Sequence, residues 1–191
     1  MSRRFLSQPF IPIIFAPLVL FLPSILRGEV LFWGTPILQF FPWRFLAWKT
    51  ILRGSLPLWN PLVGMGSPLI ANYQSAVFYP PNWLTLFAYA LGGIAGMTTA
   101  QTILVVCHLI WAGIGTSLLL KKLKAKGLAQ TIGGLAFCMS GYLVARAGFF
   151  SINAAVAWLP WIILFVDSLA YYIEYEIRQF FPFIFGLIFV L

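Results

Sequence analysis

Long apolar runs, separated by short segments that carry charge, make up most of this chain. An apolar run of about 20 residues can cross the hydrocarbon core of a membrane as a helix. The pattern therefore predicts an all-α integral membrane protein: a helical transmembrane bundle of about four complete spans and a partial fifth. The predicted segments of this single membrane domain are a span at 5–26, an outer loop at 27–83, a short interfacial helix at 82–91, spans at 95–120, 128–146 and 149–170, and a partial span at 180–191.

The first apolar run has two interpretations. A basic start followed by an apolar run is also typical of a signal peptide, but this run is long and no small-residue cleavage site follows it. We therefore expect a spanning helix. Its prolines should bend the helix without abolishing it; they are Pro9, Pro12, Pro17 and Pro23.

The outer loop combines aromatic and helix-breaking residues. Residues 36–53 mix Trp and Phe with basic side chains, so we expect one or two short helices at the membrane surface, divided at Pro42. Residues 56–81 are rich in Pro and Gly, which excludes a long regular helix. Because they also carry many Trp, Tyr, Asn and Gln residues, we expect an ordered loop that caps the bundle.

The composition agrees with a membrane location. Hydrophobic residues make up 61% of the chain and charged residues only 8%, and the mean hydropathy is +0.94. The net charge of +8 could suggest nucleic acid, but the basic residues stand in short clusters beside apolar runs, which favours control of membrane topology and excludes nucleic acid as a partner. Arg3, Arg4 and the cluster at 121–126 are then cytoplasmic, and the loop lies outside.

Few side chains can carry chemistry. Cys107 and Cys138 fall within predicted spans, where a free thiol is an apolar filler and a disulfide is not expected. His108 is the sole histidine, so we expect a packed or hydrogen-bonded histidine within the membrane, with a polar pathway as the alternative. Nothing indicates a metal site. Asp167 should lie near the cytoplasmic end of its span.

On this topology, Glu29 is the one carboxylate outside the membrane. It is therefore the candidate catalytic base of the outer loop. The alternative is that Glu29 pairs with Arg27 at the interface. The outer arginines Arg44, Arg53 and Arg146 could hold a lipid-linked phosphate, or could simply neutralise anionic headgroups.

Several motifs carry a resemblance to a known family. They are GTPILQFFPW at 34–43, GSLPLWNP at 54–61, GMGSP at 64–68, QSAVFYPP at 74–81, SGYLVAR at 140–146 and AWLP at 157–160. In this order they resemble bacterial YfhO-type membrane proteins, which are similar to the C-type glycosyltransferases.

The resemblance implies a bacterial inner-membrane enzyme that takes a sugar from a polyprenyl-phosphate donor and transfers it on the outer face. Members of the family are much longer, so it also implies that the chain is an N-terminal piece. In similar sequences an Asp stands near Thr35, which leaves Glu29 as the substitute base. We expect sugar binding by loop residues and Arg146; the candidates are Gln39, Trp59, Asn60, Asn72, Tyr73, Gln74, Tyr79 and Arg146. The alternative is a non-catalytic polytopic protein, such as a transporter or flippase-like subunit or an inactive remnant.

Overall fold

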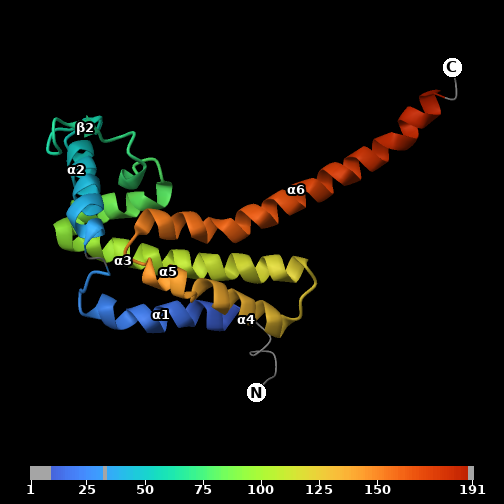
Figure 1. Cartoon of the computed structure of the whole chain (residues 1–191), viewed down its shortest axis with the longest axis horizontal. Coiled ribbons are helices and arrows are strands. Elements are labelled where there is room, and N and C mark those ends of the chain that lie inside the picture. The colour runs from blue at the N-terminus through green and yellow to red at the C-terminus, as the bar shows by residue number, and fades with distance from the viewer. Residues whose placement is uncertain (1–9, 32–33, 189–191) are drawn as a thin grey trace.

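The computed structural model describes the backbone of residues 10–31 and 34–188, and side chains as far as residue 173. Four helices run side by side: α1 (Phe10–Leu26), α3 (Trp83–Lys122), α4 (Gly127–Cys138) and the first half of α6 (Phe150–Ile188). The second half of α6 leaves this bundle and projects away from it (Figure 1). Three of the described segments are long and apolar enough to span a membrane: Pro80–Lys122, Gly127–Ala145 and Phe150–Ile173. With the shorter apolar α1, they indicate a helical, multi-pass membrane protein, as the sequence predicts.

The loop folds over one end of the bundle (Figure 1). It contains a π-helix, η2 (Pro36–Phe40), that continues directly into α2 (Phe41–Leu52), so the division expected at Pro42 is a change of helix type within a continuous helical backbone. The strands β1 (Trp59–Asn60) and β2 (Ser67–Pro68) pair antiparallel, and the 3-10 helices η3 (Tyr73–Ser75) and η4 (Pro80–Asn82) lead into α3. The expected ordered loop therefore has a defined conformation.

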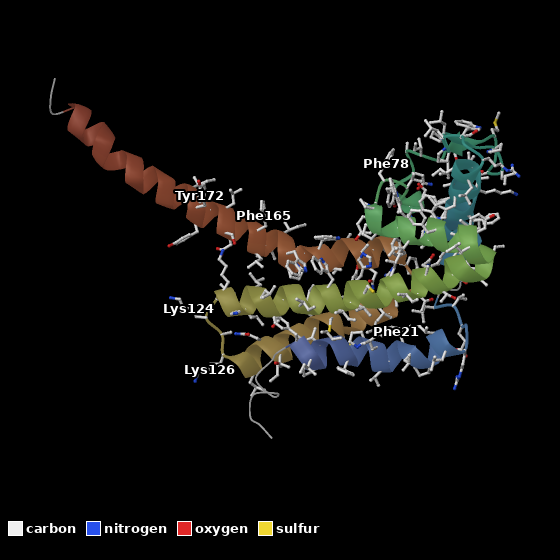
Figure 2. All side chains as sticks on the ribbon, turned by 180° about the vertical axis from the view of Figure 1, so that it is seen from behind. Phe21, Phe78, Lys124, Lys126, Phe165 and Tyr172 are labelled. Carbon is white, nitrogen blue, oxygen red and sulfur yellow. The ribbon has the colours of Figure 1, made fainter. Side chains whose placement is uncertain are left out.

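A cluster of lysines lies at the end of the bundle away from the loop. Lys124 and Lys126 lie at the end opposite Phe78 and the loop (Figure 2). At the lysine end, Lys122 Nζ forms an ion pair of 2.5 Å with Asp167 and also donates to Ser168 Oγ at 2.8 Å. Asp167 thus lies at the end predicted to be cytoplasmic, where it joins α6 to α3.

The helix predicted at 82–91 and the span predicted at 95–120 are the two parts of α3, which meet at a kink at Gly93 (φ 59°, ψ −147°), so their separation is confirmed. Two other predicted boundaries differ from the structure. The span predicted at 128–146 is divided at Met139–Ser140 into α4 and α5 (Gly141–Ala145), where Ser140 Oγ accepts from Leu143 N–H at 3.4 Å. Polar side chains at helix starts favour such breaks.

The second difference concerns α6. The spans predicted at 149–170 and 180–191 leave a connection between them at 171–179, but the backbone of this stretch is helical, and the same helix continues as far as Ile188. The segment contains charged residues but neither Gly nor Pro. Charge ends a membrane span without ending a helix, because Glu and Arg are good helix formers.

Candidate functional site

Two neighbouring cavities lie beneath the loop, between it and helices α3 and α6. The larger, about 580 Å³, is lined by residues 70–73 and 76–79 of the loop and by Phe150, Ser151, Ala154, Ala155 and Trp158 of α6. The smaller, about 270 Å³, is lined by Tyr79, Pro81, Leu104, Cys107, His108, Trp111 and Trp158. Tyr79 and Trp158 line both cavities and therefore form their shared wall.

A chain of hydrogen bonds runs through this wall. Trp158 Nε1–H donates to Tyr79 Oη at 2.9 Å, and Tyr79 Oη lies 2.6 Å from His108 Nε2. The other ring nitrogen, Nδ1, lies 2.6 Å from the carbonyl oxygen of Leu104. The histidine is 5% exposed, so the expectation of a packed, hydrogen-bonded histidine is confirmed, while its depth in the membrane stays a prediction.

Local turn chemistry holds Tyr79 in place. The Asn72 side chain accepts from Gln74 N–H at 2.9 Å and so caps η3, which ends at Ala76 with a left-handed backbone (φ 50°). Asn82 Nδ2 then donates to Ala76 O at 3.0 Å, and this bond ties the turn to the start of α3. Asn at such positions satisfies backbone groups that regular structure leaves free.

Aromatic contacts between α3 and α6 fix the part of the smaller cavity that Trp111 and Trp158 line. Trp111 and Trp161 stack with centroids 4.0 Å apart and an interplanar angle of 15°, and Trp161 Nε1–H donates to Trp111 O at 3.0 Å. Trp158 meets Trp111 edge to face at 5.3 Å. Aromatic contacts of this kind join α3 to α6 and hold the Trp158 indole beside Tyr79.

A buried cation lies next to the larger cavity. Arg44 of α2 is 1% exposed, and its Nη1 donates to Gln101 Oε1 of α3 at 2.6 Å. Its guanidinium carbon lies 5.0 Å from the centroid of Phe150, whose ring lines the cavity. Burial lowers the pKa of Arg44 to about 10, so the group stays charged at neutral pH. Its Nε has no hydrogen-bond partner within the described residues.

The structure places three of the predicted sugar-binding residues at the larger cavity: Asn72, Tyr73 and Tyr79. Their role in substrate binding stays a prediction. Gln39 and Trp59 are exposed outside both cavities.

The other three predicted sugar-binding residues also lie outside the cavities. Asn60 and Gln74 are buried, and Asn60 Oδ1 accepts from Leu62 N–H at 2.9 Å. Arg146 is exposed, with its guanidinium 5.2 Å from the ring centroid of Phe149.

The candidate base lies elsewhere. Glu29 forms an ion pair of 3.6 Å with Arg27, with half of its side chain exposed, and it lines neither cavity. This is the alternative arrangement that the sequence left open. Among the side chains that the structure describes, no carboxylate lines either cavity, and the titratable groups of the linings are hydroxyl, imidazole and thiol groups.

Sequence reasoning missed the grouping of His108, Trp158 and Phe150 around Tyr79. Tyr79 and His108 are 29 residues apart, and Tyr79 and Trp158 are 79 apart. The available signals were a lone histidine and the AWLP motif at 157–160, and neither says which loop residue it meets.

Metal binding has no support in the described part of the chain, where His, Cys, Asp and Glu do not gather in any group of three or more that could hold an ion. The resemblance to YfhO-type proteins stays an interpretation of the motifs. Comparison of the chain with models of protein families, with curated proteins and with solved structures found no match.

Proposed function

We propose that the chain is part of a glycosyltransferase of the bacterial inner membrane, with a cytoplasmic N-terminus and the loop on the outer face. The proposal rests on one observation above all: the 580 Å³ cavity under the loop, whose wall combines Tyr73, Tyr79 and Trp158 with a few polar groups. Binding sites for small molecules are commonly of this size and are lined mainly by apolar and aromatic side chains. Sugar faces stack well on aromatic rings.

The second cavity suits the lipid part of the donor. Apart from Tyr79 and His108, its lining is Pro81, Leu104, Cys107, Trp111 and Trp158, which are apolar or weakly polar groups. A polyprenyl chain in this cavity and a sugar in the larger one would place the phosphate linkage near their shared wall. The nearby Arg44 cation, which lies beside Phe150, would favour the negative charge of that phosphate.

A transfer assay tests this function. The protein in lipid nanodiscs is supplied with a panel of radiolabelled polyprenyl-phosphate hexoses, and label released from the lipid carrier is measured. We expect transfer by the wild type and a loss of about tenfold or more in Trp158→Ala, which removes the shared aromatic wall. The matched control is Phe165→Ala on the same helix, because Phe165 is 68% exposed and lines neither cavity.

The variant Glu29→Gln tests whether Glu29 is the general base. General-base catalysis typically contributes about a hundredfold to ten-thousandfold, so a loss of that size would assign the role to Glu29, as the sequence predicts. Retained transfer would show that Glu29 is not the base.

A non-catalytic membrane protein is the second candidate, and one observation favours it. The carboxylates with described side chains, Glu29 and Asp167, both lie in ion pairs and outside the cavities. Absence of transfer from every donor by a folded wild-type protein would favour this candidate over the enzyme.

A further inference from the structure

The hydrogen bonds around Tyr79 have a definite direction. The Leu104 carbonyl oxygen can only accept, so the proton of the neutral His108 ring lies on Nδ1. His108 Nε2 then carries the lone pair and accepts from the Tyr79 hydroxyl at 2.6 Å. Trp158 Nε1–H can only donate, and it donates to Tyr79 Oη at 2.9 Å. The order of donation is therefore Trp158 to Tyr79, Tyr79 to His108, and His108 to Leu104.

This arrangement leaves Tyr79 Oη able to receive a proton. A hydroxyl has one hydrogen and two acceptor positions. The hydrogen points to His108 and Trp158 occupies one acceptor position, so one acceptor position stays open. Tyr79 lines both cavities, which places its side chain beside any group bound in them.

We propose that Tyr79 and His108 form a proton-transfer pair that activates the hydroxyl of an acceptor molecule bound in the larger cavity. This inference rests on the proposed function. The acceptor hydroxyl gives its proton to Tyr79 Oη while the Tyr79 proton passes to His108 Nε2. The acceptor oxygen forms a bond to C1 of the donor sugar, and the bond from C1 to the phosphate oxygen breaks, with its electron pair leaving on polyprenyl phosphate.

The proton that His108 has taken up is released after the sugar has been transferred. The imidazolium keeps its Nδ1–H bond to Leu104 O and returns the extra proton through Tyr79 to the departing phosphate or to water. His108 acts through Tyr79, and Trp158 N–H stabilises the negative charge that develops on Oη during the transfer.

Tyr79 needs His108 in order to remove a proton from the acceptor hydroxyl. Burial raises the pKa of Tyr79, and the Trp158 hydrogen bond lowers it by a smaller amount. The phenol therefore stays protonated at neutral pH and can remove a proton only if another group takes its own. His108 Nε2 is placed to do so, and the lining residues that the structure describes include no carboxylate that could replace it.

The first measurement concerns the hydrogen bonds and does not depend on transfer. Since the chain has one histidine, ¹⁵N NMR of labelled protein in nanodiscs reports His108 directly. We expect a neutral ring protonated on Nδ1, with the Nε2 resonance shifted in Tyr79→Phe and unchanged in Tyr89→Phe. Tyr89 is the matched control because it packs against Phe45 and lines neither cavity. A ring protonated on Nε2 would overturn the proposal.

The second measurement is transfer from a polyprenyl-phosphate hexose. Tyr79→Phe and His108→Gln should each lower kcat by about a hundredfold or more, with the KM for the donor little changed. The amide oxygen of Gln can accept the Tyr79 hydrogen bond but takes up no proton, so His108→Gln separates proton acceptance from simple positioning. Tyr89→Phe should keep the wild-type rate.

The combined results distinguish a failure of the Tyr79–His108 pair from a failure of the proposed function. Wild-type transfer that persists in Tyr79→Phe and His108→Gln would overturn the pair and leave the proposed function standing. Absence of transfer in the wild type, with the NMR spectrum of a folded protein, would overturn the proposed function and the catalytic role of the pair together. Loss of transfer in Glu29→Gln, with transfer retained in Tyr79→Phe and His108→Gln, would assign the base to Glu29 and overturn the pair.

Discussion

Arg44 and Gln101 join the loop to the first long helix through a buried hydrogen bond of 2.6 Å between Nη1 and Oε1. Both side chains are 1% exposed. No carboxylate accompanies the guanidinium among its described contacts, which are Gln101 and the Phe150 ring. Burying a charge with so few partners destabilises the folded state, and the hydrogen bond to Gln101 offsets part of that cost.

Gln101→Leu should therefore destabilise the fold by about 1–3 kcal/mol, because it leaves a charged donor buried without its acceptor. Arg44→Met removes the charge but leaves Gln101 Oε1 unpaired. The double variant should cost less than the sum of the two single changes, since neither unpaired group remains. The free energy of unfolding in mixed micelles measures all three, and strictly additive values would contradict the coupling.

The bend in α3 depends on one glycine. Gly93 has φ 59° and ψ −147°, a backbone conformation that is almost confined to glycine, whereas the neighbouring Gly92 lies outside the positive-φ region. A Cβ at either position would meet nothing within 4 Å. Gly93→Ala should thus destabilise the protein by about 1–3 kcal/mol through backbone strain alone.

Gly92→Ala is the control for that change. It lies in helical structure with equal open space, so it should be neutral or stabilising by about 0.5–1 kcal/mol. Unfolding of both variants in micelles gives the comparison. Equal effects at the two positions would show that the bend does not need the Gly93 conformation.

Hydropathy and helix-breaking residues predicted much of this fold. The apolar runs gave the bundle helices, Pro42 marked the start of α2, and Gly93 marked the change of direction in α3. The error at 171–179 came from treating charge as a helix break, although charge affects membrane depth and Gly or Pro affects the backbone.

The site was harder to predict, because it depends on distant contacts. Aromatic and amide content identified Asn72, Tyr73 and Tyr79 as candidates, and all three lie at the cavity. The same reasoning selected Asn60, which lies outside both cavities, although its side chain accepts a backbone N–H two residues later, as that of Asn72 does. Composition cannot separate an Asn that completes a turn at a cavity from one that completes a turn elsewhere, because the local hydrogen bond is the same.

Membrane orientation can be tested at the two ends of the bundle, which Figure 2 shows as the Phe78 end and the Lys124 and Lys126 end. A protease tag inserted after Lys124 should be cytoplasmic, because clustered lysines are retained on that side. A tag within 63–67, in the loop, should be extracytoplasmic. Cleavage of intact spheroplasts measures both, and protection of both tags from the same side would contradict the topology.

Ionisation of Tyr79 gives a pH test with a definite sign. Burial favours the neutral phenol and so raises its pKa above the ordinary value of about 10. Any stability that comes from this raised pKa is complete below about pH 10 and is lost as the pH rises through the pKa of the folded state. The difference in unfolding free energy between wild type and Tyr79→Phe should therefore be constant up to about pH 10 and then fall.

A second variant tests the hydrogen bond to Tyr79. Trp158→Phe removes the N–H donor that lowers the pKa of Tyr79, so absorbance titration should place Tyr79 ionisation at a higher pH in that variant than in the wild type. Tyr89→Phe serves as the control for both measurements, and a Tyr79 that ionises below the other tyrosines would contradict a buried, hydrogen-bonded phenol.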